Sequence, residues 1–214
     1  AVTFSNTGTV TLGDEASDNL AFTGGVTATA PSSKSIAGTI SAAGTGVIDL
    51  GTTGVSVTAD ATVGGASTGQ ITLGDATLDD DVTLTVGAGA ATPIALGSVT
   101  GTANNGASNL TINTTGAVTV GGAVGTDIGT VTITDSGGTT FSSTVDAATV
   151  TLTDTTGAIT FNGALTATTL NTAAQAYSVA INEGGTITNA VTFSNTGTVT
   201  LGDEASDNLA FTGG

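Results

Sequence analysis

Residues 130–148 read TVTITDSGGTTFSSTVDAA, and the stretch that follows, 149–167, reads TVTLTDTTGAITFNGALTA. The two stretches align almost position for position. Each begins with a strand in which Thr alternates with Val, Ile or Leu, continues through a turn that contains Asp, and reaches a second strand that ends in Phe. Such alternation is the period of a β-strand with one buried face and one wet face. The pair therefore predicts two successive coils of the same β-structure.

The coil can be followed through most of the chain by the apolar residue that closes a short strand before a turn. These residues recur at near-regular intervals, at Leu50, Leu73, Leu96, Val120, Phe141, Phe161, Ile181 and Leu201. This spacing is typical of one rung of a β-solenoid, in which two or three short strands are joined by tight corners. We therefore predict an all-β fold, a parallel β-helix (β-solenoid), with about nine rungs of roughly 20–23 residues in each repeat unit.

The repeat unit is defined by an identity between the two ends of the chain. Residues 1–25 read AVTFSNTGTVTLGDEASDNLAFTGG, and residues 190–214 repeat the same letters without a change. We interpret residues 1–189 as one complete tandem repeat unit, and residues 190–214 as the start of the next unit, which continues the same solenoid. The expected partners are accordingly further copies of the repeat in the same chain.

The first quarter of the chain is less regular. The stretch FTGGVTAT from Phe22 resembles FNGALTAT from Phe161, which predicts a rung at Phe22 rather than at Leu12. Residues 31–35, PSSKS, have no strand pattern. We expect them to form a loop that leaves the solenoid at one corner, with Lys34 exposed to solvent.

Charge and composition exclude several classes of function. Seventeen acidic residues stand against a single basic one, so the formal net charge is −16. Binding to nucleic acid or to an anionic membrane surface requires a basic surface, which this chain lacks. No apolar run approaches the roughly 20 residues that cross a bilayer, so we expect no membrane insertion of this segment. Charged residues make up only 8% of the chain and aliphatic residues recur at strand spacing, which argues against disorder.

Catalytic chemistry has little support in the residue types. The chain contains no His, Cys or Arg, so the usual nucleophilic triads and zinc sites cannot be assembled. Asp79, Asp80 and Asp81 raise the alternative of a glycan-cleaving carboxylate pair. Successive side chains of a strand point to alternate faces, so Asp79 and Asp81 would lie on the same face. No aromatic stacking residue lies near them, and a solvated turn is the favoured interpretation. We predict that the protein is not an enzyme and has no catalytic residues.

Calcium is the one cofactor that the acidic residues suggest. Carboxylates that lie close together are the hard oxygen ligands that this cation prefers. The candidates fall in the turn at residues 13–19, in its copy at 202–208, and in the Asp run: Asp14, Glu15, Asp18, Asp79, Asp80, Asp81, Asp203, Glu204 and Asp207. None of these stretches matches the EF-hand loop, and exposed corners without a bound ion are the alternative.

Rungs such as VTLTDTTGAITFNGALTATTLNT (150–172) and TITNAVTFSNTGTVTLGD (186–203) resemble those of giant bacterial β-strand-repeat or filamentous-haemagglutinin-like surface proteins. The resemblance covers the whole chain. It implies a right-handed parallel β-helix that serves as a structural filament, sheath or adhesin shaft at the bacterial cell surface, outside the cell, with the option of lateral association into fibres. Two alternatives stay open: a glycan-binding or glycan-cleaving β-helix, and an ice-binding protein that uses outward Thr ladders.

Overall fold

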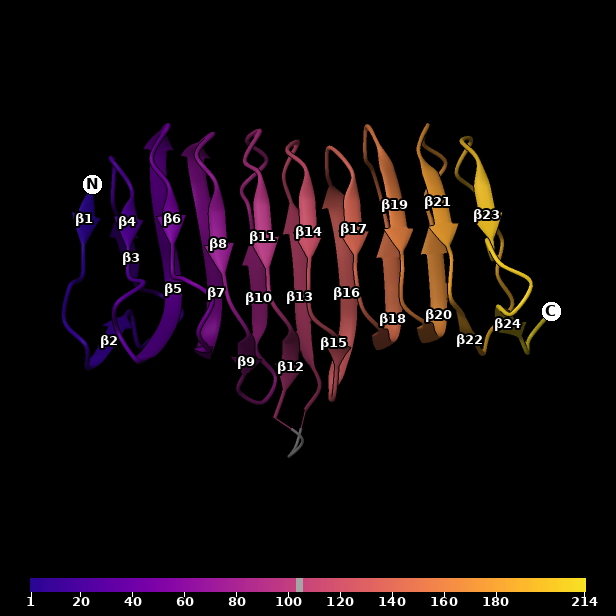
Figure 1. Cartoon of the computed structure of the whole chain (residues 1–214), viewed down its shortest axis with the longest axis horizontal. Helices are drawn as coiled ribbons and strands as arrows, with labels where there is room; N and C mark the ends of the chain where they lie inside the picture. Colours follow the sequence, from indigo (N-terminus) through magenta and orange to yellow (C-terminus); the bar gives the residue numbers. More distant parts are fainter. Residues whose placement is uncertain (103–105) are drawn as a thin grey trace.

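The structure, a computed structural model, describes residues 1–102 and 106–214, and these residues form β-strands without any helix. The turns of the chain lie side by side along one axis, and the two ends of the chain lie at opposite ends of the resulting rod (Figure 1). The strands pair in parallel with strands of the neighbouring turns. The predicted fold class, an all-β parallel β-solenoid, is thereby confirmed.

Ten short strands form the first of two sheets, which we call sheet A. In spatial order they are β1 (Val2–Thr3), β4 (Val26–Thr27), β6 (Ile48–Asp49), β8 (Ile71–Leu73), β11 (Ile94–Leu96), β14 (Val118–Val120), β17 (Thr139–Phe141), β19 (Ala158–Phe161), β21 (Ser178–Ile181) and β23 (Val199–Leu201). The spaced apolar residues of the sequence, from Leu73 to Leu201, are register partners in this sheet. The predicted rungs are therefore real turns, about ten in the part of the chain that the structure describes.

Fourteen strands form the second sheet, which we call sheet B. They are β2 (Thr9–Leu12), β3 (Asn19–Ala21), β5 (Ser33–Gly44), β7 (Val55–Ser67), β9 (Ala76–Leu78), β10 (Thr83–Val86), β12 (Val99–Gly101), β13 (Ser108–Asn113), β15 (Val124–Gly125), β16 (Ile128–Asp135), β18 (Val145–Leu152), β20 (Leu165–Thr172), β22 (Gly184–Ile187) and β24 (Asn208–Phe211).

Each turn crosses sheet B in two pieces. The first limb consists of Val55–Val57 of β7 and the segments in register with it, and the second limb consists of Ala61–Val63 of β7 and its register partners. In β7 one long strand supplies both limbs, whereas in the next turn β9 and β10 supply one limb each. A turn thus runs through sheet A, the first limb and the second limb, in that order.

The register of sheet A fixes where every turn begins and ends. The residues in register are Val2, Val26, Ile48, Ile71, Ile94, Val118, Thr139, Ile159, Val179 and Val199. The longest steps between neighbours in this series are those from Val2 to Val26 and from Ile94 to Val118. The shortest are the last three, which are equal and run from Thr139 to Val199. The turns therefore differ in length by only a few residues.

The core is a single column of aliphatic side chains that runs along the inside of the rod. It follows from the alternation in the sequence, since every second residue of a strand points inward. Few aromatic residues contribute: Tyr177 is buried, and the buried rings of Phe141 and Phe161 stack in adjacent turns with centroids 5.0 Å apart. A core of small branched residues suits this narrow cross-section, because opposite sheets leave little space between them.

A second column, made of buried hydroxyls, runs along the corner between the second limb and sheet A. Its members are Ser67, Thr92, Thr114, Ser136 and Thr155, one in each of five successive turns. The hydroxyl of Thr155 donates to the carbonyl of Ser136, one turn back, at 2.6 Å. Thr114 makes the same contact with the carbonyl of Thr92, also at 2.6 Å. The buried hydroxyls are thereby satisfied by backbone carbonyls of the preceding turn.

Two expectations for the first quarter of the chain are wrong. Residues 33–35 do not loop out but open strand β5, and Lys34 is only 2% exposed. Lys34 stands in register between Val10 and Val55, at an inward position. The serines and the lysine hid the strand because strand patterns are recognised by their apolar residues.

Phe22 is the second correction. It follows β3 in the second limb and donates its backbone N–H to Ser41, whereas Phe161 lies in sheet A. The likeness between the two stretches was local, because Phe-x-Gly corners occur at more than one corner of a turn.

Within residues 1–102 and 106–214, no helix has the length and apolar character needed to cross a bilayer.

Candidate functional site

The acidic turn at residues 13–19 is held together by one of its own carboxylates. Asp18 Oδ2 accepts the backbone N–H groups of Asp14 and Glu15, at 2.9 and 3.1 Å. These hydrogen bonds lower the pKa of Asp18 below its ordinary value. Asp14 and Glu15 point to solvent. The carboxylate of Asp18 therefore already serves to close the turn.

The copy of this turn at residues 202–208 has the same geometry. Asp207 Oδ2 accepts the N–H groups of Asp203 and Glu204, both at 2.8 Å. The turn is thus a property of the local sequence, since it forms at two places in the rod with different neighbours.

Asp79, Asp80 and Asp81 form a turn between the first and second limbs, in which Asp80 is half-buried. Asp79 and Asp81 are exposed, and Asp81 has a left-handed backbone with φ of 58°. The carbonyl of Asp79 accepts a hydrogen bond of 2.7 Å from the hydroxyl of Ser108. Glycan cleavage by this turn stays an untested alternative, which replacement of Asp79 or Asp81 by Asn would test.

The three acidic stretches do not combine. In the part of the chain that the structure describes, no group of three or more acidic side chains is arranged so that it could hold a metal ion. Binding at a single stretch would need water or backbone carbonyls to complete the ligand set of calcium. The calcium hypothesis therefore stays a prediction for solution measurements.

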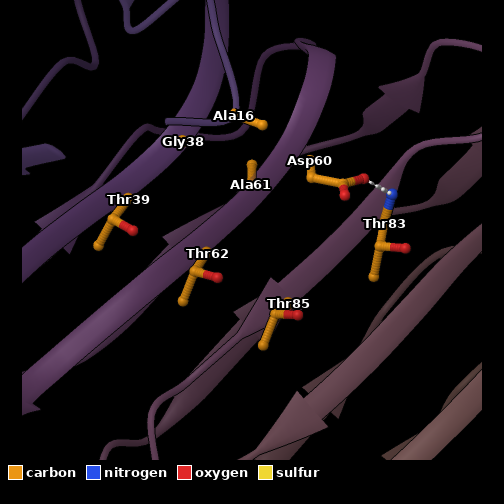
Figure 2. Close-up of a pocket in the computed structure, with 8 residues that line it drawn as sticks. All are labelled: Ala16, Gly38, Thr39, Asp60, Ala61, Thr62, Thr83 and Thr85. Atoms are coloured by element: carbon orange, nitrogen blue, oxygen red, sulfur yellow. Dashed lines mark hydrogen bonds between the residues drawn. The ribbon is translucent and has the colours of Figure 1, made fainter. Parts of the chain in front are cut away.

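A shallow hollow of about 200 Å³ lies on the outer face of sheet B, near the N-terminal end of the rod. Thr39, Thr62 and Thr85 of three successive strands line it, and Asp60 and Thr83 lie at its edge (Figure 2). Asp60 Oδ1 accepts the N–H of Thr83 at 2.7 Å. One carboxylate, which already accepts a hydrogen bond, lines the hollow together with Thr, Ala and Gly residues, so the hollow offers hydrogen bonds but no acid–base pair.

The hollow belongs to a longer array of outward hydroxyls on the second limb. One column joins Thr39, Thr62, Thr85, Thr111, Thr132, Thr151 and Asn171 in register. A second column, two positions earlier on each strand, joins Thr83, Asn109, Thr130, Thr149 and Thr169. Five successive turns thus present two rows of Thr or Asn without a charged residue in either row. The Thr-x-Thr pattern is visible in the sequence. Its continuation from turn to turn is shown only by the register between the strands of neighbouring turns.

Lys34, the only basic side chain, is buried and forms hydrogen bonds inside the rod. Its ammonium donates to the carbonyl of Pro31 at 3.3 Å and to the hydroxyl of Thr53. Both acceptors are uncharged, and burial lowers the pKa of the lysine below its ordinary value. This residue therefore does not offer a positive charge to a ligand at the surface.

Comparisons with family models, with curated proteins and with solved structures found no match to this chain. The fold and the geometry of the sites therefore stand on the chain's own sequence and structure.

Proposed function

We propose that this chain is a non-enzymatic structural unit of a long filament, sheath or adhesin shaft at the outside of a bacterial cell. The observation that carries the proposal is that one segment occurs with identical sequence at both ends of the rod. Residues 1–25 pair with β4 and β5, and the identical residues 190–214 pair with β21 and β22. A unit that starts again on its own last turn is suited to extension by repetition.

Other features agree with a passive shaft. The hydroxyl columns, acidic turns and aliphatic core are spread along the axis instead of converging on one cleft. The sequence lacks His, Cys and Arg, the residues on which most catalytic sites depend. The resemblance to bacterial surface repeats supports the placement outside the cell. We further propose that the net charge of −16 keeps shafts apart at low salt, so that lateral association requires screening by salt or divalent cations.

Immunogold electron microscopy of intact source cells tests this function. Antibodies against the whole chain are expected to label threads a few nanometres wide that extend from the cell surface. Label that appears only after the cells are permeabilised, or label confined to isolated short rods, would contradict the proposal. Pre-absorption of the antibody with the purified chain is the control for specific labelling.

The double column of Thr and Asn on the second limb favours ice binding as a second candidate. Its hydroxyls repeat about every 4.8 Å between turns and about every 6.6 Å along each strand. A regular array of this kind, without charges, can order a layer of water. Ice binding predicts thermal hysteresis that is lost when Thr132 is replaced by Lys and kept when Thr140, an outward residue of sheet A, is replaced by Lys. Absence of hysteresis in the parent chain would eliminate this candidate.

A further inference from the structure

The identical segments at the two ends of the chain occupy different places in the turn. In the first copy, Val10 lies in the first limb and Leu20 in the second limb. In the second copy, the equivalent residues Val199 and Leu209 lie in β23 of sheet A and in β24 of the first limb (Figure 1). The second copy is therefore displaced by one strand position, a third of a turn.

The start of the second copy shows the same displacement. Val2 lies in sheet A, whereas the residues around its equivalent, Val191, lie beside the second limb of β20. There the N–H of Ser194 donates to the hydroxyl of Thr172 at 2.7 Å. From Val2 the chain makes eight turns, counted along sheet A to Val179, and passes two further strand positions to reach Val191.

The pairings that begin a unit can start again from this displaced position. In the first copy they are Val2 with Val26, Val10 with Lys34 and Leu20 with Ile40. These pairs are 24, 24 and 20 residues apart, within the range of 20 to 24 residues between neighbouring turns of sheet A. The same pairings in the second copy join Val191 to position 215, Val199 to position 223 and Leu209 to position 229 of the next unit. The next unit thus stacks on the rod with turns of ordinary length.

The corner between the second limb and sheet A favours the displaced position. Asn195 is only 7% exposed, and its side-chain N–H donates to the carbonyl of Tyr177, one turn back, at 3.0 Å. A Cβ added at Gly197 would collide with the same carbonyl. The equivalent Asn6 is exposed, and a Cβ added at the equivalent Gly8 meets no atom within 4 Å. This Asn-x-Gly corner therefore makes its contacts with a preceding turn only in the displaced position.

The same corner is open to a following turn. Asn195 Oδ1 is buried and has no hydrogen-bond partner among the residues that the structure describes. Asn195 extends the column of buried Ser and Thr side chains at this corner. In the first unit, the buried ammonium of Lys34 lies at the corner between sheet A and the first limb, bonded to Pro31 and Thr53. Displacement by one strand position brings the equivalents of these three residues to the corner of Asn195, so the buried polar column continues into the next unit.

We propose that each unit of the array is rotated about the shaft axis by one strand position relative to the unit before it. Every surface feature then returns to the same side of the shaft only after three units. This inference rests on the proposed function, since it concerns the array. One unit contains eight turns and two thirds of another, so three units contain 26 whole turns. At about 4.8 Å for each turn, the full pattern repeats about every 125 Å.

The rotation distributes the surface features of a unit around the shaft. The double column of Thr and Asn lies on the second limb in the first unit, at the place of the first limb in the second unit, and at the place of sheet A in the third. The acidic turn already shows one such step. At residues 13–19 it lies between the two limbs, and at 202–208 it lies between sheet A and the first limb. Every edge of the shaft therefore carries carboxylates, and shafts repel one another from all sides.

Engineered cysteine pairs test the rotation in the whole chain extended by a second copy of residues 26–214. The sequence contains no cysteine of its own. Ala180 and Thr200 are register partners in the displaced position. In an array without rotation, Thr200 would keep the first-limb place of its equivalent, Thr11, and would lie beside Thr186 instead.

The variant A180C/T200C is expected to form its disulfide under mild oxidation roughly tenfold or more faster than T186C/T200C. The interior pair T119C/T140C, also register partners in sheet A, is the positive control and should close about as fast as A180C/T200C. Peptide masses after free thiols are blocked show which cysteines are joined. Faster closure of T186C/T200C, or equal rates for the two junction pairs, would overturn the rotation.

Electron microscopy of the extended chains separates the rotation from the proposed function. Rods in which residue 200 is joined to residue 186 would retain the shaft and overturn the rotation. Extended chains that form no rods would remove both.

Discussion

Thr side chains cover the outer face of the strands, and aliphatic side chains cover the inner face. Thr is β-branched and fits the pleated backbone, while its hydroxyl reaches solvent or a neighbouring backbone group. Where Thr points inward, as Thr155 does, its hydroxyl donates to a backbone carbonyl of the preceding turn. The same residue type therefore covers the outer face of sheet B and completes the buried corners, with its role set by its place in the turn.

Replacement of Thr155 by Val tests the buried corner column. Val keeps the shape but leaves the buried hydroxyl of Ser136 without its acceptor, while the carbonyl of Ser136 keeps the N–H of Thr156. We expect the free energy of unfolding to fall by about 1–3 kcal/mol, the penalty for an unsatisfied buried polar group. Urea denaturation measures the loss. The exposed neighbour Thr156 provides the control, because its replacement by Val should change stability by less than about 0.5 kcal/mol.

Replacement of Lys34 by Met should stabilise the protein by about 0.5–2 kcal/mol at neutral pH, because a buried ammonium with uncharged acceptors is replaced by an apolar side chain. The gain should depend on pH. Since the pKa of Lys34 is lowered in the folded protein, the unfolded state binds more protons between that pKa and 10.5. The parent therefore gains stability as pH rises through this window, and the advantage of the variant shrinks.

Denaturation of both proteins from neutral pH up to the ordinary lysine pKa of 10.5 measures that difference. Tyr177, whose pKa burial raises, titrates in both proteins and largely cancels in the comparison. A stability difference that stays constant with pH would contradict the buried, destabilising lysine.

The calcium hypothesis concerns the acidic turns. Bound cation would stabilise the folded state by mass action, so a chelator should lower the melting temperature of protein prepared with calcium. Replacement of Asp14, Glu15, Asp203 and Glu204 by the corresponding amides should abolish the shift that the two turns cause, and it leaves Asp18 and Asp207, which close the turns, in place. A melting curve that chelator does not change would mean that the turns carry no cation.

At the level of strands and corners, the sequence predicts the turns that follow the regular apolar pattern, and it misses the strands that depart from that pattern. The column from Leu73 to Leu201 was predicted because each turn repeats the same alternation before a glycine, asparagine or serine corner. Strand β5 was missed because it begins with Ser-Lys-Ser, and the inward position of Lys34 has no signal in a pattern of apolar residues. The continuous Thr columns needed the register, which local sequence does not fix between strands a whole turn apart.

Close contact between turns makes some glycines essential to a strand. Gly185 of β22 has φ of 128°, and a Cβ there would collide with the backbone of Leu165. Replacement of Gly185 by Ala is therefore expected to destabilise the protein by more than about 1 kcal/mol. Gly8 is the control, because a Cβ there meets no atom within 4 Å. A thermal melt in which the two variants behave alike would contradict the close packing of β22 on β20.

The hydrophobic core, the strand ladders and the acidic corners of the molecule are all distributed along one axis. In such a structure each turn contacts only its neighbours, and stability is the sum of turns and their interfaces. The identical segments at the two ends suit the rod to extension, and they lie one strand position apart in the turn. The acidic turns and the Thr array would both recur with each unit, so any weak binding to them would be multiplied along the shaft.

Rod length as a function of repeat number tests the stacked-turn architecture most directly. Chains with one, two and three added copies of residues 26–214 can be compared by negative-stain electron microscopy under the same conditions. Eight to nine turns per unit at about 4.8 Å each predict that every copy lengthens the rod by about 40 Å without changing its width. Particles that grow in all dimensions, or separate into unconnected globules, would contradict the account.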